Sequence, residues 1–374
     1  MNTLANTLGI KLLDRLILND LIPKLLASIA AFSALFLVAG PLLAASKYQA
    51  LGFPLWIIAQ FMGWDLLEFL PYTLPMGMLL AALLGFDRLS RDSEIVALFA
   101  GSISFLRIIV PVVGLGLAVS LLNYVFNDRI ASYAHAWVAD FNSHRQDVIG
   151  ETTRPLDLVN RSDGKLQVTV HIEKGYDVIV KALRGVTITV YGPDGQPSQV
   201  IYADRAIAHG SGFKTWTLYD GSVHNLQGVP FSSPFPSMET NEINKTPENM
   251  SFLQRDPETL NFHDLQRQIN ELRAGGGDGS DIRNAEVGLW FKVALPFSCL
   301  IFSLVGAPLG LRSPRSGKVS GLVWALPIML GYYVIYMTMS NIAVGGAVPP
   351  ILAAWLPNII GLFVGAGLIW KASR

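Results

Sequence analysis

The chain has 374 residues, of which 51% are hydrophobic and only 15% charged, and its mean hydropathy is +0.41. Its 28 basic residues balance 28 acidic ones, so it lacks the positive charge typical of a nucleic-acid-binding protein. Several charge-free runs reach the roughly 20 residues that a helix needs to cross a bilayer. The composition therefore indicates an integral membrane protein rather than a soluble domain.

Six membrane-spanning helices are predicted along the chain. The expected spans are residues 25–46, 56–86, 106–127, 290–311, 319–340 and 351–370. The last charge-free run is too long for one helix, and Gly345-Gly346 with Pro349-Pro350 divides it into two. Lys and Arg gather in the short loops on one side, which places both termini in the cytoplasm. The first apolar run is longer than the roughly 7–15 residues of a cleaved signal peptide, so none is expected.

A polar segment from Asp87 to Gly101 interrupts the apolar runs between the second and third spans. We expect it to form a cytoplasmic helix at about residues 91–100, capped by Ser90 and ended by Gly101. The expected i,i+4 ion pairs are Asp87–Arg91 and Arg88–Asp92. So many charges beside a membrane indicate a surface with a specific role.

This short helix combines a carboxylate with hydrophobic side chains. Ile95, Leu98 and Phe99 form an apolar stripe, and Glu94 lies one helical step from Leu98. The pattern predicts a docking surface for a protein partner, although an interfacial helix resting among lipid headgroups would have the same pattern. Residues 316–319 (SGKV) faintly resemble a phosphate-binding loop, but Val319 stands where that loop has Ser or Thr, and Arg312 stands where it has its first glycine. This chain is therefore not expected to hydrolyse ATP by that route.

The one large polar region, residues 128–286, has 15 Lys and Arg against 21 Asp and Glu and is placed outside the cytoplasm by the alternation of loops. The alternating runs and turns are residues 166–172, 186–191, 192–195 and 220–221. They predict short antiparallel strands of a sandwich or jelly roll, followed by a connecting helix at about residues 262–273. Cys299 lies in the fourth span, so this domain has no disulfide, and its histidines lack metal-ligand spacing.

The predicted fold class is therefore an α-helical membrane protein with six spans and an extracytoplasmic, jelly-roll-like β domain inserted between helices 3 and 4. Residues 1–127 form the N-terminal membrane half, residues 128–286 the β domain and residues 287–374 the C-terminal membrane half.

Several short motifs, in a fixed order, resemble those of the permeases of the lipopolysaccharide-export ABC system, the LptF/LptG family, also called YjgP/YjgQ. The motifs are residues 13–18 (LDRLIL), 70–75 (LPYTLP), 85–95 (GFDRLSRDSEI), 185–188 (GVTI), 216–221 (WTLYDG), 295–297 (LPF) and 307–312 (APLGLR). They extend along most of the chain, so the resemblance is specific.

The resemblance implies a permease subunit of the bacterial inner membrane, without catalytic residues or cofactors of its own. ATP and Mg²⁺ would bind to a partner, a cytoplasmic ABC ATPase dimer, which docks at the helix between spans two and three. By position, Glu94 is the key contact, with Arg91, Ile95 and Leu98 as neighbours. Two such permeases, either related or identical, would enclose a cavity for lipopolysaccharide. The periplasmic β-jelly-roll domain would pass the lipid to a bridge protein and its membrane-anchored relative.

Substrate contacts are expected at two places. The inward residues of the strands would line a lipid groove, although each is also an ordinary core residue: Val168, Val170, Ile172, Ile188, Val190 and Ile201. Some members of the family that the chain resembles carry basic residues on the outer half of span one, where this chain has Gly40 and Pro41. Contact with the lipid phosphates would therefore fall to Lys47, Lys292, Arg129 or the second permease, with snorkelling of Lys292 to headgroups as the alternative for that residue.

Other charged and small residues leave alternatives open. Asp65 and Glu68 would either face the cavity or lie at the outer interface. Arg312, Arg315 and Lys318 would contact the ATPase or simply follow the topology. Gly361 and Gly365 indicate a close helix contact or a coincidence. A gradient-driven carrier using the Asp65/Glu68 pair, and a non-transporting receptor or scaffold that displays the β domain, are the alternative functions.

Overall fold

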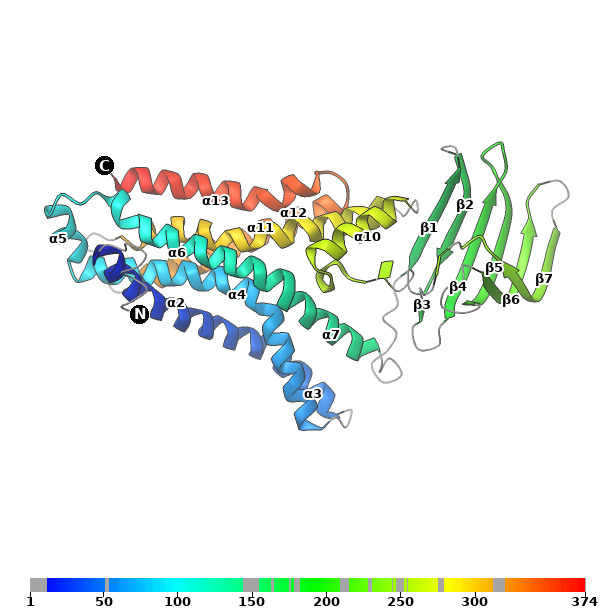
Figure 1. The fold of residues 1–374 in the computed structure, drawn as a ribbon, viewed down its shortest axis with the longest axis horizontal. Coiled ribbons are helices and arrows are strands. Elements are labelled where there is room, and N and C mark those ends of the chain that lie inside the picture. Colours follow the sequence, from blue (N-terminus) through cyan, green and yellow to red (C-terminus); the bar gives the residue numbers. More distant parts are fainter. Residues whose placement is uncertain are drawn as a thin grey trace. The chain divides into compact units, whose positions relative to one another are not determined.

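The computed structural model describes residues 12–50, 54–143, 155–162, 165–174, 176–177, 182–208, 215–227, 231–243, 245–246, 252–253, 255–274, 279–311 and 320–373. The chain divides into two compact units, one helical and one mainly of strands (Figure 1). The helical unit comprises Met1–His135 and Val287–Arg374, and the β unit comprises Ala136–Glu286.

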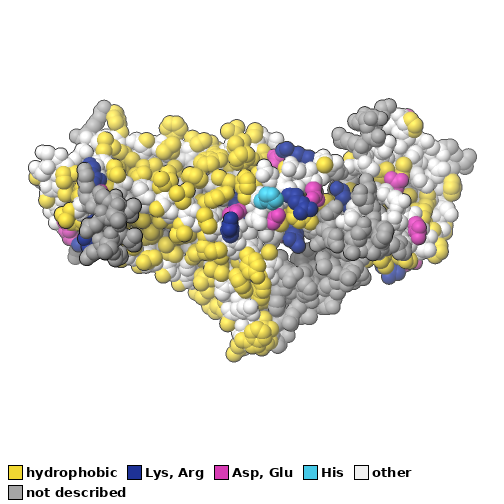
Figure 2. Space-filling model, in the orientation of Figure 1, with side chains coloured by type: hydrophobic (Ala, Val, Ile, Leu, Met, Phe, Trp, Pro, Cys, Tyr) yellow, Lys and Arg dark blue, Asp and Glu magenta, His cyan; other side chains and the backbone are white. Residues whose placement is uncertain are grey.

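The helical unit contains long apolar helices joined by short connections. Its elements are α2 (Leu12–Ala39), α3 (Pro41–Ala50), α4 (Leu55–Arg91), α5 (Glu94–Ala100), α6 (Phe105–Val125), the π-helix η1 (Phe126–Ala131), α7 (Ser132–Ser143), α11 (Gly279–Gly310), α12 (Ser320–Val344) and α13 (Pro350–Ala372), with α7 and α11 continuing into the β unit. Six helices among the described residues are long and apolar enough to cross a membrane, which confirms the predicted helical membrane fold. Hydrophobic side chains cover most of the visible face of these helices (Figure 2).

The first apolar helix differs in extent from the predicted span. α2 begins at Leu12 and ends at Ala39, and a new helix, α3, starts at Pro41. The charged residues near the start of α2 lower its hydropathy, which is why the helix looked shorter in the sequence. Asp14 nevertheless pairs with Arg107 at 2.5 Å, so the charge has a partner within the protein.

Close contacts at glycines hold the apolar helices together. A Cβ atom at Gly310 of α11 would lie 2.7 Å from the carbonyl oxygen of Leu83 in α4. Gly361 and Gly365 of α13 face Ile301 and Leu304 of α11, so this glycine pair forms a helix contact within the chain. Small residues allow such close approach where no hydrophobic effect drives helices together in lipid.

Prolines within α4 and α11 leave carbonyl groups without their helical donors. Pro75 has no N–H to donate to the carbonyl of Pro71, and that carbonyl instead accepts a hydrogen bond from Asn123 Nδ2 at 3.1 Å. In the same way, Pro296 leaves the Lys292 carbonyl to accept from Asn127 Nδ2 at 3.2 Å. Two asparagines one helical turn apart, on α6 and η1, therefore donate hydrogen bonds to the two carbonyl groups that the prolines leave free.

The β unit contains one antiparallel sheet among the described residues. Its strands are β1 (Leu156–Ser162), β2 (Lys165–Ile172), β3 (Tyr176–Asp177), β4 (Ala182–Tyr191), β5 (Pro197–Ala208), β6 (Trp216–Asn225) and β7 (Phe231–Thr240). The order is β1-β2-β4-β5-β6-β7, with β3 paired to β4, so β1 and β7 form opposite edges (Figure 1). The predicted β domain is thus confirmed, and its strands follow one another as a meander.

Of the two predicted turns, the one at residues 192–195 is present, whereas residues 220–221 lie within a strand. Residues 192–195 connect β4 to β5 as expected, with Gly195 at a φ of 76°. The predicted turn at residues 220–221 is wrong, because β6 continues from Trp216 to Asn225. Asp220 does adopt a left-handed φ of 53°, but within a strand that pairs on both sides. The Asp-Gly pair therefore marks a local distortion of the sheet.

A helix and a short 3₁₀ turn complete the β unit. α10 runs from Phe262 to Ala274 and follows η2 (Pro257–Thr259). Gln268 of α10 is buried, and its Nε2 lies 3.0 Å from the carbonyl oxygen of Arg255 and 3.2 Å from those of Phe252 and Leu253. One side chain therefore secures the irregular segment before the helix.

Candidate functional site

The candidate docking segment consists of two helices rather than the single helix predicted at residues 91–100. Arg91 is the last residue of α4, and α5 starts only at Glu94. Ser90 lies within α4 and not at the start of a helix, and Ser93 precedes α5 with a left-handed φ of 57°. The physical reason is that the predicted i,i+4 ion pairs extend the end of α4 instead of starting a new helix.

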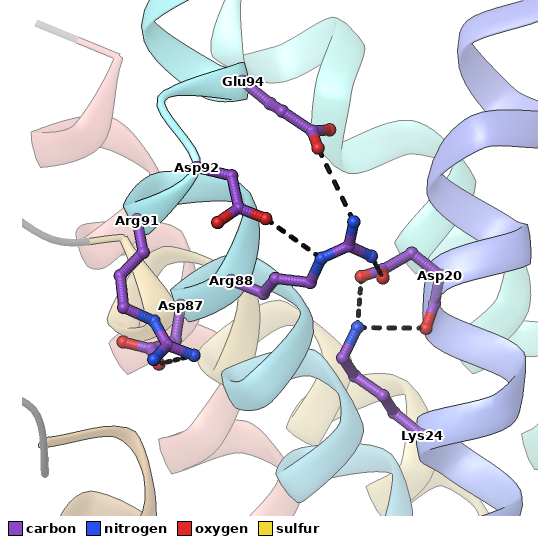
Figure 3. Close-up of polar contacts among 7 residues, drawn as sticks. All are labelled: Asp20, Lys24, Asp87, Arg88, Arg91, Asp92 and Glu94. Carbon is purple, nitrogen blue, oxygen red and sulfur yellow. Dashed lines mark hydrogen bonds and ion pairs between the residues drawn. The ribbon is translucent and has the colours of Figure 1, made fainter.

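Both predicted ion pairs are present at this end of α4 (Figure 3). Arg91 Nη2 lies 3.2 Å from Asp87 Oδ2, and Arg88 Nε donates to Asp92 Oδ2 at 3.1 Å. Arg88 also contacts Glu94, with 3.7 Å between Nη2 and Oε1. The sequence therefore predicted the local pairs correctly but not the contact between Arg88 and Glu94.

A further partner of Arg88 comes from a distant part of the chain. Arg88 Nη1 donates to Asp20 Oδ1 of α2, and Asp20 Oδ2 also pairs with Lys24 Nζ at 2.5 Å (Figure 3). The side chain of Asp20 is only 7% exposed, whereas that of Arg88 is 48% exposed. The charges of the docking segment are thus connected to the first long helix.

The apolar side chains of α5 divide between the protein interior and its surface. Ile95 is 3% exposed and, with Leu98 packed beside it, belongs to the core cluster that includes Ile17 and Leu21 of α2. Ile95 is therefore buried against the bundle and Leu98 is only partly exposed, and the predicted docking role of both residues stays a prediction. Val96 and Phe99 are the exposed large hydrophobic residues of this helix.

Of the three residues proposed for phosphate contact, the structure describes the side chains of Lys292 and Arg129. Lys292 is buried, with 7% exposure, and its Nζ donates to Ser132 Oγ, so it neither snorkels to headgroups nor faces an open surface. Arg129 is exposed on the π-helix η1, a type of helix frequent at functional sites. Lys47 belongs to α3, but its side chain lies outside the described part of the structure.

Other predicted sites fall in both described and undescribed regions. Glu68 lies 3.3 Å from His135 Nδ1, so this carboxylate is paired inside the helical unit. Asp65 lies one helical turn before Glu68 on α4. The predicted contacts at Arg312, Arg315 and Lys318 lie outside the described residues.

The predicted groove residues lie on one face of the β-sheet. Val168 pairs in register with Val190, Val170 with Ile188, and Ile188 with Ile201. Because side chains alternate along a strand, residues opposite one another in register share a face. Buried side chains among them are those of Val168, Val170, Ile172, Ile188 and Ile201, and Val190 is partly exposed. This face is therefore a closed apolar interior.

Comparisons with known proteins point to one family. The family model described as lipopolysaccharide export system permease LptF/LptG matches residues 15–371. The chain is 23% identical over 329 residues to the lipopolysaccharide export system permease protein LptF of Escherichia coli (strain K12), covering 82% of this chain and 80% of that protein. LptF of Shigella flexneri is similar to the same extent.

Proposed function

Because the chain belongs to the family of lipopolysaccharide export system permeases LptF/LptG, we propose that it is the membrane subunit of an ABC transporter that extracts lipopolysaccharide. Its family and its six apolar helices make it an inner-membrane permease. In the proposed assembly, a separate cytoplasmic ATPase dimer binds ATP and Mg²⁺, and this chain binds no cofactor. The observation that carries the proposal is the short helix α5, whose Glu94 stands 36% exposed between two membrane-length helices.

We propose that α5 and both termini lie in the cytoplasm and the β unit in the periplasm. Arg88, Arg91 and Arg107 flank α5, and Lys and Arg favour the cytoplasmic side of short loops. Glu94 would enter the ATPase surface as a charged contact, with Arg91 beside it. The exposed side chains of Val96 and Phe99 would supply the apolar part that docking helices usually need.

The proposed lipid route continues from the membrane to the β unit. A second permease, related or identical, would complete an apolar cavity, and Arg129, whose side chain is exposed, is a candidate for contact with a lipid phosphate. The buried face around Val170, Ile188 and Ile201 would hold acyl chains, which requires the sheet to open because these side chains are now closed from solvent. A periplasmic bridge protein and its membrane-anchored relative would receive the lipid.

The docking proposal is tested by purifying the permease in mild detergent and measuring recovery of the ATPase. We expect Glu94→Ala to weaken binding at least about tenfold, as truncation of a central charged contact does. The matched control is Asp204→Asn, an exposed carboxylate of the β unit, for which binding should stay within about twofold of wild type. Equal recovery with Glu94→Ala and wild type would reject the docking assignment.

A gradient-driven carrier is the second candidate, supported by the pairing of Glu68 with His135 inside the helical unit. A carrier of this kind would require Asp65 and Glu68 for transport and would need no ATPase. We expect Asp65→Asn with Glu68→Gln to leave lipopolysaccharide transport intact in proteoliposomes, while an ATPase that cannot hydrolyse ATP abolishes it. The reverse result would favour the carrier.

A further inference from the structure

Arg88 is shared by three carboxylates that lie in unequal surroundings (Figure 3). Asp20, on α2, is nearly buried, while Asp92 and Glu94, on either side of the turn into α5, are partly exposed. Arg88 donates hydrogen bonds to Asp20 and Asp92, whereas Glu94 lies 3.7 Å away, beyond hydrogen-bond distance. The residue proposed for docking is therefore the one that Arg88 holds least firmly.

Burial explains which carboxylate retains Arg88. A buried carboxylate without a cation is costly, whereas an exposed one is stabilised by water. Asp20 therefore needs Arg88 and Lys24 to offset the cost of burying its charge. Glu94 is partly exposed, so water can stabilise its charge without Arg88. As long as Asp20 engages the guanidinium, Glu94 stays available to another partner.

We infer that Asp20 is a positioning residue, which keeps Arg88 from capturing Glu94 and so sets how readily the ATPase docks at α5. This inference rests on the proposed docking role of Glu94. Asp20 touches no partner itself in this scheme and acts entirely through Arg88. In this scheme Glu94 binds a cation or hydrogen-bond donor on the ATPase, and that group competes with Arg88 for the Glu94 carboxylate.

The position of Asp20 on α2 gives this arrangement a consequence for transport. Leu21, the next residue, packs where Gly85 of α4 leaves room, one helical turn before Arg88. A shift of α2 away from α4 would separate Asp20 from Arg88 and release the guanidinium toward Glu94. Because coupling between sites is reciprocal, ATPase docking would in turn favour the arrangement in which α2 and α4 are together.

The test measures the dissociation constant of the purified ATPase for the intact permease assembly in nanodiscs. Asp20→Asn should weaken docking about two- to fivefold, because Arg88 then competes for Glu94 as an exposed ion pair can. Adding Arg88→Gln to Asp20→Asn should restore docking to within about twofold of wild type. A merely structural role for Asp20 would not be rescued by a second substitution. The matched control is Asp14→Asn, which makes the same charge change in α2 and breaks a similar pair with Arg107.

Each outcome bears on the inference. Unchanged docking in Asp20→Asn, or no rescue in the double variant, would overturn it. If Asp20→Asn does not accumulate, Lys24→Gln serves instead: it leaves Asp20 more dependent on Arg88, so docking should be equal or tighter, and a weakening beyond twofold would overturn the inference. If Glu94→Ala docks normally, the proposed docking role of Glu94 fails and the role of Asp20 fails with it. If Glu94→Ala weakens docking but Asp20→Asn does not, the inference about Asp20 fails alone.

Discussion

The hydrogen bond from Asn123 to the carbonyl of Pro71 allows a quantitative test of how this bundle accommodates its prolines. The Asn123 donor is needed because Pro75 supplies no N–H to that carbonyl. Replacing Pro75 by Ala restores a backbone donor and makes the Asn123 bond redundant. The two substitutions should therefore be coupled, although each lies on a different helix.

The magnitude follows from the atoms involved. Asn123→Leu removes the hydrogen bond to Pro71, which has a net value of about 1 kcal/mol in water and about 0.6 kcal/mol on average between membrane helices, and a weaker one at 3.7 Å to Cys299 Sγ. It also removes Asn123 Oδ1, which is buried without a hydrogen-bond partner among the described residues, so the single substitution is partly compensated. The interaction energy of the double variant cancels this second contribution, and we expect it to be about 1 kcal/mol.

Unfolding in detergent micelles of increasing dodecyl sulfate content, followed by tryptophan fluorescence, gives the four free energies of the cycle. The control pairs Asn123→Leu with Pro327→Ala, which changes a proline in another helix, α12. That pair should be additive within about 0.3–0.5 kcal/mol. Additivity for Asn123→Leu with Pro75→Ala as well would refute the role assigned to this bond.

Two further substitutions test packing and backbone geometry. Gly310→Ala should destabilise the helical unit by about 1–3 kcal/mol in the same unfolding assay, because the new methyl group would meet the Leu83 carbonyl, whereas Gly331→Ala, with open space around it, should be neutral or slightly stabilising. Asp220→Gly should be tolerated and Asp220→Val should lower the thermal unfolding temperature, because a left-handed residue costs a β-branched side chain on the order of 1–3 kcal/mol.

The helices and the alternation of strands could be predicted because both patterns are local. The run from Val168 to Ile172 alternates in the sequence, and its apolar members are buried on one face of the sheet. The extent of α2 and the course of β6 were predicted less well. The sequence does not reveal that Asp14, near the start of α2, pairs with Arg107. It also does not reveal that the strand containing residues 220–221 pairs with β5 and β7 on its two sides.

Only part of the candidate site could be predicted, because its contacts join residues that lie far apart in the sequence. Glu94 could be identified from its place in a short motif, but not its relation to Arg88 and Asp20, because Asp20 lies 68 residues from Arg88 along the chain. The burial of Lys292 depends on Ser132, 160 residues away. Periodicity also does not determine which side of a seven-residue helix faces the bundle, and Ile95 therefore looked available for docking.

The ends of α5 explain why a docking residue would be placed on so short a helix. Ser93 and Ser102 both adopt left-handed backbone conformations, with φ of 57° and 60°, which cost a non-glycine residue about 1–2 kcal/mol each. Such geometry persists only where the surroundings impose it, and burial of Ile95, worth about 1.5–3 kcal/mol, is large enough to offset one of them. With both ends and one face fixed, α5 has a single orientation. Glu94, its first residue, is then displayed in one direction, so a partner would lose little conformational entropy in binding it.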